Sequence, residues 1–229
     1  MTETLDKRLA AVAAQVRQGS RVADIGTDHA YLPVALVQRG CCPSAIAADL
    51  RAGPAERARQ IIREAGLQER IEVRLGDGLA PVQPEEVDDI VIAGMGGETI
   101  AAILEAAPWT QNERYQLVLQ PMSKPEVLRR FLMTHGFSIV HEQPVEEPPR
   151  WYTVLTAVFT AAPPEEEEAA WYIGAIPAGQ GGAYLEKQRQ RLEKRAQGLA
   201  HTQPDAPEIA RLRAISARIQ AHLEKGEHS

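Results

Sequence analysis

The sequence contains only two cysteines among its 229 residues, and these two are neighbours, Cys41 and Cys42. Adjacent cysteines are poorly placed to form a disulfide with each other, and they lack the spacing of a metal site. The sequence therefore predicts neither a disulfide-stabilised domain nor a metal centre. We expect a protein of a reducing, cytoplasmic compartment.

Long apolar runs are also missing. No run approaches the roughly 20 residues that a helix needs to cross a bilayer. The first residues, Met1–Asp6, have neither a basic start nor an apolar stretch, so we expect no signal peptide and no membrane association. With 44% hydrophobic and 24% charged residues, the composition is that of a soluble globular protein. The length allows one full α/β domain and a small appendage.

Positive charge is scarce in the middle of the chain, although the formal net charge of the whole is only −6. Residues 71–168 hold 6 basic and 17 acidic side chains, whereas residues 1–70 hold 10 basic and 8 acidic ones. Residues 183–225 hold 9 basic and 5 acidic side chains. A phosphate-rich partner would therefore meet the two ends of the chain rather than its middle.

Strand-like and helix-like segments alternate through the first two thirds of the chain. Seven segments have the apolar composition of strands: 21–26, 44–49, 71–75, 89–93, 116–120, 138–142 and 151–160. Helical spacing predicts helices over 6–18, 29–39, 54–65 and 123–135. Alternation implies crossover connections and a parallel sheet, and the last two strands follow each other closely enough to form an antiparallel pair. We expect a Rossmann-like α/β fold with a seven-stranded, mostly parallel sheet, the strand inventory of a class I methyltransferase.

A change of composition at 163–168, two prolines followed by four glutamates, predicts a boundary between a domain at 1–162 and another at 163–229. Beyond it, apolar residues recur at helical spacing on both sides of Pro204 and Pro207. Each helix is too poor in apolar residues to be stable alone. We therefore expect an antiparallel helical hairpin that packs like a coiled coil.

Small and acidic residues follow four of the predicted strands. They are Asp24 and Gly26 at the first strand, Asp49 at the second, Asp77 and Gly78 at the third, and Gly94, Met95 and Gly96 in a predicted loop at the fourth. Open α/β sheets bind ligands at the edge where their parallel strands end. The sequence therefore predicts a ligand site formed by these four segments.

The residue types favour S-adenosylmethionine (SAM) over a dinucleotide. Asp49 is placed to accept hydrogen bonds from both ribose hydroxyls, and Asp77 could accept one from an adenine amino group. A single acid at a strand end more often caps a helix, so the prediction depends on the set. A pyrophosphate site needs the pattern G-x-G-x-x-G, and only Gly26 stands in that turn. Carboxylates would repel pyrophosphate, whereas a sulfonium tolerates them.

Asp28 is the candidate catalytic residue, with one alternative of equal weight. Either Asp28 faces a substrate, or Thr27 or Asp28 caps the helix that contains Pro33. His29 and Tyr31 lie beside it in the sequence and would face either solvent or substrate.

Two long motifs make the sequence recognisable. Asp24–Pro33, which reads DIGTDHAYLP, and Ile92–Gly97, which reads IAGMGG, resemble the bacterial tRNA (adenine(22)-N(1))-methyltransferase family, often called TrmK. The resemblance extends to Gly76–Leu79, Leu119–Pro121 and Glu147–Tyr152. It implies a SAM-dependent class I methyltransferase with a C-terminal helical domain that methylates N1 of adenosine 22 in tRNA.

By position, the resemblance implies a catalytic role for Asp28 and a cofactor pocket that includes Gly26, Asp49, Asp77 and the segment 94–97. Adenine N1 lies on the base-pairing edge, so the target must be unpaired or flipped out before methylation. The Asp28 carboxylate could stabilise the positive charge that grows on the base or accept a proton from N6, and the sequence leaves both open.

Basic and polar side chains are candidates for contact with tRNA. The predicted substrate-binding residues are Arg8, His29, Tyr31 and Gln120 near the site, and Lys187, Arg189, Arg191 and Arg195 on the hairpin. The alternative for the hairpin set is a solvated coiled-coil surface. Two other functions stay open: a SAM-dependent methyltransferase that acts on a small molecule, and a SAM- or RNA-binding module without catalysis. We expect a monomer.

Overall fold

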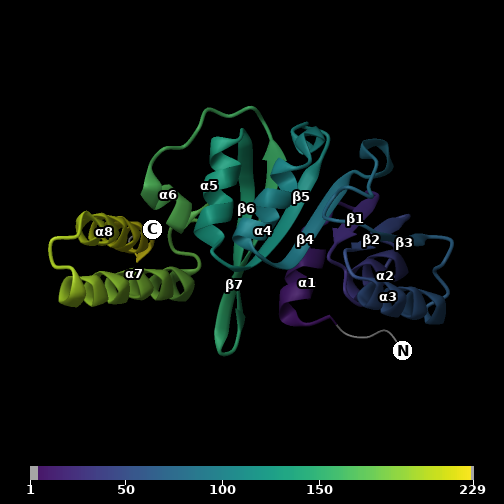
Figure 1. The fold of residues 1–229 in the computed structure, drawn as a ribbon, viewed down its shortest axis with the longest axis horizontal. Coiled ribbons are helices and arrows are strands. Elements are labelled where there is room, and N and C mark those ends of the chain that lie inside the picture. The colour runs from purple at the N-terminus through teal and green to yellow at the C-terminus, as the bar shows by residue number, and fades with distance from the viewer. Residues whose placement is uncertain (1–4, 228–229) are drawn as a thin grey trace.

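The structure is a computed structural model that describes residues 5–227 of the chain (Figure 1). Residues 1–4 and 228–229, at the outer ends of the two predicted domains, lie outside the described part. The prediction of no signal peptide concerns residues 1–6 and therefore falls mostly outside it as well. In chain order the elements are α1 (Lys7–Ala13), β1 (Val22–Ile25), α2 (Tyr31–Gln38), β2 (Ala45–Asp49), α3 (Ala52–Glu64), β3 (Ile71–Leu75), β4 (Asp89–Gly96), α4 (Gly97–Glu105), β5 (Gln116–Ser123), α5 (Pro125–Thr134), β6 (Phe137–Glu147), β7 (Arg150–Phe159), α6 (Glu168–Ile173), α7 (Gly182–Thr202) and α8 (Pro207–Glu227). Two short 3-10 helices, Pro84–Glu86 and Pro108–Thr110, flank β4 and α4.

The seven strands form one sheet in the order β3-β2-β1-β4-β5-β7-β6. Strands β1 to β5 are parallel, and β7 pairs antiparallel with both β5 and β6. The predicted mostly parallel sheet of Rossmann-like type, with its late antiparallel pair at one edge, is confirmed. All residues of β1 and β2 are buried, as expected for strands that are covered on both faces.

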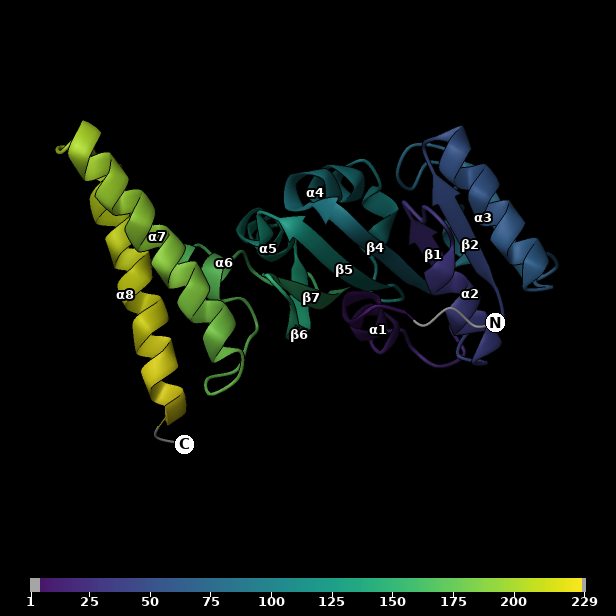
Figure 2. The same ribbon diagram turned by 90° about the horizontal axis from the view of Figure 1, so that it is seen from below.

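Helices cover both faces of the sheet (Figure 2). On one face, Ile100 of α4 and Leu128 of α5 share a core with Ile25 of β1. On the other face, Leu36 of α2 and Ile62 of α3 share a second core with neighbouring strand residues, and α1 contributes to it through Val12. Because the chain reverses direction across the sheet between β1 and β4, the ends of these two strands flank a crevice.

The structure corrects two sequence predictions. The helix predicted over 6–18 ends at Ala13, and its N-cap is Asp6, whose carboxylate accepts a hydrogen bond from the Leu9 amide at 2.6 Å. The loop predicted at Gly94–Gly96 is the irregular end of β4, and α4 starts directly at Gly97. A side chain at Gly97 would collide with the Lys124 carbonyl oxygen, so this close approach requires glycine.

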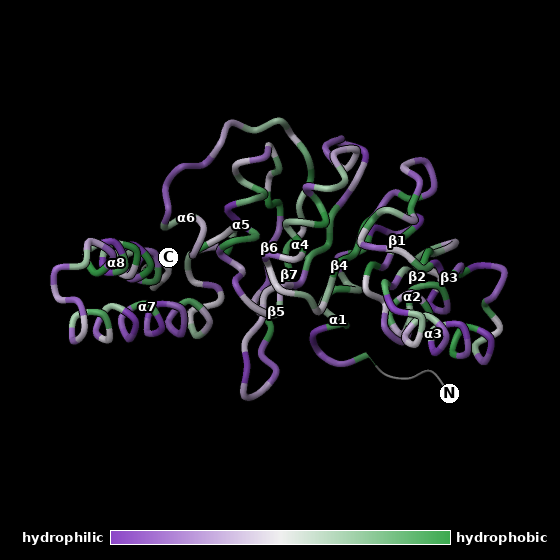
Figure 3. The backbone as a smooth tube through the Cα atoms, viewed as in Figure 1, coloured by the Kyte–Doolittle hydropathy of each residue, from purple (hydrophilic) through white to green (hydrophobic). Residues whose placement is uncertain are grey.

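The C-terminal residues form the predicted antiparallel hairpin. Helices α7 and α8 pack together around a third apolar core that includes Leu192 and Ile219. Hydrophobic and hydrophilic residues alternate along both helices (Figure 3). The buried hydrophobic ones form the core between the two helices. The boundary at residue 162 stays a prediction, because α6 beyond it packs against both α5 and α8.

A buried ion pair joins this C-terminal part to the sheet domain. Arg129 of α5 donates to Glu142 of β6 at 2.6 and 3.0 Å, and its remaining N–H groups reach the backbone carbonyls of residues 171 and 172 and the Tyr184 hydroxyl. Glu142 also accepts from the Thr153 hydroxyl at 2.7 Å and from the backbone N–H of residue 175 at 2.9 Å. Since both charged groups are fully paired, the cluster connects α5, β6, β7 and α7 without an unsatisfied charge.

Breaking this pair on one side should be costly. In Arg129→Met the Glu142 carboxylate would stay buried without its cation, so we expect the free energy of unfolding to fall by about 3–5 kcal/mol. The double variant Arg129→Met/Glu142→Leu, which removes both charges, should lose much less. Urea denaturation measures both. A double variant as unstable as the single one would contradict this account.

Candidate active site

A cavity of about 630 Å³ opens at the edge of the sheet where the parallel strands end, which we call the carboxyl edge. Its size is within the range of small-molecule sites. Eleven of the predicted site residues line it: Arg8, Asp24, Gly26, Asp28, His29, Tyr31, Asp49, Asp77, Gly78, Gly94 and Met95. The structure thus brings together residues from α1, α2 and the ends of four strands.

Two carboxylates lie buried at the ends of β1 and β2. Asp24 is 5% exposed, and its carboxylate accepts a hydrogen bond from the Thr27 hydroxyl at 2.6 Å. Burial raises the pKa of Asp24 to about 6; the Thr27 hydrogen bond opposes this shift, and the nearby Asp49 charge adds to it. A cationic ligand in the cavity would favour the ionised form of Asp24.

The chain between β1 and α2 follows the end of β2. The backbone N–H groups of Gly26 and Thr27 both donate to the Ala48 carbonyl, at 2.8 and 3.1 Å. The Asp49 carboxylate accepts from the Arg51 N–H at 2.8 Å and, more weakly, from the Asp28 N–H at 3.4 Å. Because a carboxylate has about four acceptor positions, Asp49 retains the capacity to accept two hydroxyl groups.

Glycine is required in this turn. Gly26 has a φ of 75°, and a Cβ atom there would collide with the methyl group of Met95 from the end of β4. The turn after β1 and the end of β4, two of the four segments predicted to form the site, therefore touch at the floor of the cavity. This contact explains why a residue without a side chain stands at position 26.

Asp28 does not cap the following helix. Helix α2 begins at Tyr31, and its N-cap residue Ala30 makes no side-chain capping bond, while the Thr27 hydroxyl is directed to Asp24. The capping alternative is therefore wrong. Asp28 has a left-handed φ of 48°, and its half-exposed carboxylate lies 2.9 Å from His29 Nδ1 and 3.4 Å from an Arg57 guanidinium nitrogen.

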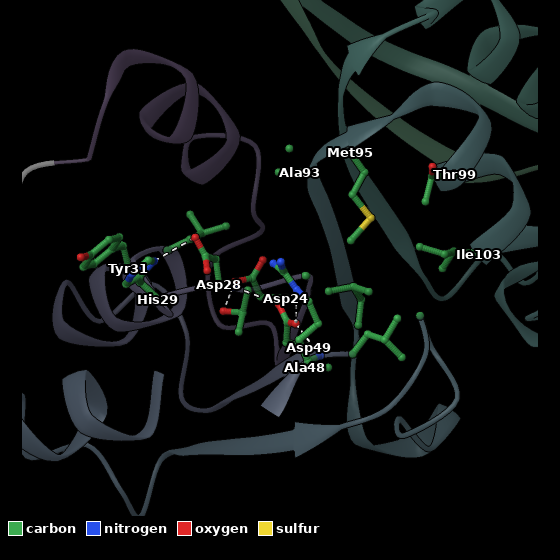
Figure 4. A pocket seen from close by; sticks show the side chains of 18 of the residues that line it. Asp24, Asp28, His29, Tyr31, Ala48, Asp49, Ala93, Met95, Thr99 and Ile103 are labelled. Atoms are coloured by element: carbon green, nitrogen blue, oxygen red, sulfur yellow. Dashed lines mark hydrogen bonds and ion pairs between the residues drawn. The ribbon is translucent and has the colours of Figure 1, made fainter. Parts of the chain in front are cut away.

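The close view shows how these side chains are arranged (Figure 4). Asp24, Asp28 and Asp49 lie between the His29–Tyr31 pair on one side and Met95, Thr99 and Ile103 on the other. The rings of His29 and Tyr31 are parallel, with their centroids 5.2 Å apart. The arrangement leaves Asp28 beside the cavity with one oxygen on His29 and the other on Arg57.

Gln120 is placed differently from the sequence prediction. Its side chain is fully buried in the second half of β5 and does not line the cavity. Its carbonyl oxygen accepts from an Arg8 guanidinium nitrogen at 2.9 Å and from the Gly94 N–H at 3.1 Å, and its amide nitrogen donates to the Pro121 carbonyl. Gln120 thus fixes Arg8 and the end of β4, two neighbours of the cavity.

The remaining predicted residues lie outside the cavity lining. Gly96 precedes α4, where a Cβ atom would come within 3.3 Å of the Ser123 hydroxyl oxygen. The four hairpin residues are Lys187, Arg189, Arg191 and Arg195, all on α7. Three of them have carboxylate partners: Glu186 for Arg189, Glu126 for Arg191 and Glu208 for Arg195.

The sequence predictions missed several lining residues. Leu50 follows Asp49 and is 66% exposed, which is unusual for leucine. Thr99 and Ile103 come from α4, and Met122 lies near the end of β5, beyond the strand predicted at 116–120. Leu50 could have been predicted as a lining residue, because it comes directly after the acid that ends its strand. No local pattern marks the other three, because only the packing of α4 and the extension of β5 bring them to the cavity.

Two negative findings apply to residues 5–227. Within that range no group of three or more histidine, cysteine, aspartate or glutamate side chains gathers in a way that could hold a metal ion. No helix in the same range is long and apolar enough to span a membrane.

The raised pKa of Asp24 predicts a pH dependence. The folded state binds a proton at Asp24 more tightly than the unfolded chain, in which the pKa is close to 3.8. The stability of the ligand-free protein should therefore fall as the pH rises from about 4 to about 6 and then level off. Asp24→Asn should remove this component and stabilise the ligand-free protein at pH 7.5 by on the order of 3 kcal/mol. Thermal denaturation of both proteins between pH 4 and pH 8 measures the difference; identical pH profiles would contradict it.

Comparisons with known proteins agree with this geometry. Residues 5–155 match the family model described as a methyltransferase domain. The chain is 37% identical over 202 residues to the tRNA (adenine(22)-N(1))-methyltransferase of Bacillus subtilis strain 168, covering 87% of this chain and 83% of that one.

Solved structures extend the match to nearly the whole chain. M. capricolum TrmK in complex with S-adenosyl-homocysteine is 25% identical, with a TM-score of 0.81 over 96% of this chain and 98% of that one. A Streptococcus pneumoniae protein in complex with S-adenosyl-L-methionine is 34% identical, with a TM-score of 0.79 over 96% of this chain and 100% of that one. The chain belongs to the tRNA (adenine(22)-N(1))-methyltransferase family.

Proposed function

We propose that this protein transfers the methyl group of SAM to N1 of an adenosine in tRNA, with adenosine 22 as the target that its family implies. The observation that carries the proposal is the set of acidic side chains from β1, β2 and the turn after β3 around one cavity, with the Asp28 carboxylate beside it. The Bacillus subtilis relative is named for this reaction, and two structural relatives hold SAM or its product.

The residues of the cavity fit SAM. Asp49 retains free acceptor positions for ribose hydroxyls, and the exposed Leu50 beside it offers an apolar surface for an adenine ring. Asp77 is exposed at the turn after β3 and is placed to accept from the adenine amino group. Asp24 lies buried at the floor, where a positive charge would offset the cost of ionising its carboxyl group. When bound, SAM supplies a methyl group on a positively charged sulfur.

Asp28 acts on the base in this proposal. Methylation forms a bond from adenine N1 to the methyl carbon while the bond from sulfur to that carbon breaks, so the positive charge moves from sulfur to the base. A carboxylate held next to the base favours this movement because it stabilises the charge that develops there. His29 and Arg57 hold the Asp28 carboxylate in place.

Arg8 is the cation best placed to bind the substrate near the chemistry. It lines the cavity, and only 16% of its side chain is exposed. One guanidinium nitrogen donates to Gln120, and the other terminal nitrogen lies 3.4 Å from the Asp6 carboxylate. The N–H groups that these two contacts do not use are available to a phosphate or base oriented by the cavity. His29 and Tyr31 offer parallel ring faces beside Asp28, and a flipped base could pack against them.

The deciding experiment is methylation of an unmodified tRNA transcript with labelled SAM, followed by nucleoside analysis. N1-methyladenosine at position 22 supports the proposal, and a substitution of that adenosine should abolish the label. Label found only in added small metabolites would favour a small-molecule methyltransferase. SAM binding without any turnover would favour a binding module.

Asp28 gives the sharpest mutational prediction. Asp28→Ala and Asp28→Asn should each lower kcat by about 10²–10³, the typical effect of losing one group that stabilises transition-state charge. The dissociation constant of SAM, measured by calorimetry, should change by less than about threefold. Asn serves as the size-matched control, because it keeps the shape and removes the charge. Loss of SAM binding or of folding in Asp28→Asn would assign Asp28 a structural role instead.

A further inference from the structure

The carboxyl edge of the sheet extends past the cavity to the β6–β7 hairpin. Strand β7 is antiparallel to β5, and their register pairs Leu119 with Leu155. The start of β7, with Arg150 and Trp151, therefore lies at the end where β5 finishes, which is the edge that holds the cavity. In Figure 1 the tip of this hairpin projects below the sheet, on the side where α1 also lies.

Helix α7 reaches the same edge at two points. The Lys187 ammonium lies 5.7 Å from the ring centre of Trp151 at the start of β7. An Arg191 guanidinium nitrogen lies 3.6 Å from Glu126 in the first turn of α5, which follows β5 at the carboxyl edge. Seen from below, α7 passes in front of α8, so its outer side and the carboxyl edge face the same way (Figure 2).

The basic residues on this outer side form a stripe. Lys187, Arg191 and Lys194 are four and three residues apart, which places them on one face of α7. All three are exposed, whereas Leu192 and Ala196 on the opposite side are buried against α8. We call these three residues the α7 stripe.

Four other arginines of the hairpin are neutralised by carboxylates of the hairpin or at the start of α6. Arg189 makes two hydrogen bonds to Glu186, at 2.7 and 2.8 Å, and Arg195 binds Glu208 of α8. Arg211 and Arg218 of α8 pair with Glu168 and Glu167. Within the described residues, Lys187 and Lys194 have no carboxylate within 4.0 Å, and the Arg191 contact is the longest of these hairpin pairs.

We propose that the α7 stripe binds the phosphate backbone of tRNA while the target base occupies the cavity. The inference rests on the proposed function and adds which face of the hairpin meets the RNA. A tRNA whose base enters the cavity must lie across the carboxyl edge. The α7 stripe borders this edge at a distance from the cavity, and two of its three cations have no carboxylate partner among the described residues. Of the residues that the sequence grouped with it, Arg195 lies at the side of the stripe and Arg189 on the opposite side of the helix, and both are already paired.

Charge reversal tests the proposal with a matched control. The test variant is Lys187→Glu/Arg191→Glu/Lys194→Glu. The control variant is Arg39→Glu/Arg63→Glu/Arg213→Glu, which changes the net charge equally. Arg39 and Arg63 are at the ends of α2 and α3, on the opposite edge of the sheet, and Arg213 is an exposed residue of α8. The probe is an unmodified tRNA transcript, with its affinity measured between 50 and 300 mM salt.

The test variant should bind tRNA at least about tenfold more weakly at 100 mM salt. The slope of log affinity against log salt should become shallower by about 2–3, since each lost phosphate contact removes close to one unit. The KM for tRNA should rise, while kcat at saturating tRNA and the affinity for SAM stay within twofold. The control variant should keep the wild-type slope.

An unchanged slope in the test variant, or an equal loss in the control variant, would overturn the proposal. The proposed function fails separately. Suppose that the salt slope of tRNA binding is shallower in the test variant than in the wild type, but that the wild type forms no N1-methyladenosine. The proposed function is then wrong and the proposed binding face stands. If it methylates tRNA and the test variant binds normally, the function stands and the binding face is wrong.

Discussion

Carboxylates packed at the ends of adjacent parallel strands are the constraint on which the rest of this site depends. Asp24 and Asp49 are almost fully buried at the ends of β1 and β2, and a buried polar group is costly unless it is hydrogen-bonded. Nearby hydrogen-bond donors stabilise them only in part: one hydroxyl for Asp24 and two backbone N–H groups for Asp49. The pKa of Asp24 is accordingly raised. A ligand that brings hydroxyl donors and a positive charge would complete this environment, which is why the cavity suits the proposed cofactor.

Two buried polar side chains form hydrogen bonds that connect distant parts of the chain around that cavity. Gln120 joins α1 to the end of β4 by accepting from Arg8 and from the Gly94 N–H. Arg129 joins the sheet domain to the C-terminal helices through Glu142 and Tyr184. Both side chains use nearly all of their hydrogen-bonding groups, so replacement of either leaves a buried partner without its bond. The cavity and the helical hairpin are therefore parts of one fixed arrangement.

In that arrangement, the features proposed to bind substrate lie on one side of the molecule. The cavity, α1, the tip of the β6–β7 hairpin and the α7 stripe all face the carboxyl edge (Figures 1 and 2). Positive charge on this side comes from the two ends of the chain, with Arg8 at one and α7 at the other. The acidic excess of residues 71–168 is distributed over the sheet, α4 and the linker before α6.

The sequence by itself determined the seven strands, their parallel order and the acidic or glycine residue at four strand ends, because these follow from local hydrophobic patterns and from the geometry of crossover connections. It also predicted the helical hairpin from apolar spacing. Only the tertiary structure decided that Gln120 is buried under Arg8, that Thr27 serves Asp24 rather than a helix end, and that Thr99 and Ile103 reach the cavity. Only the structure distinguished Arg191, which lies in the α7 stripe, from Arg189 and Arg195, which lie outside it. The positions of Gln120, Thr99 and Ile103 depend on groups that meet across long stretches of chain, and a local pattern carries no information about such partners. The Thr27–Asp24 hydrogen bond is local, but only the course of the backbone in the turn decides that this acceptor, rather than a helix end, receives the hydroxyl.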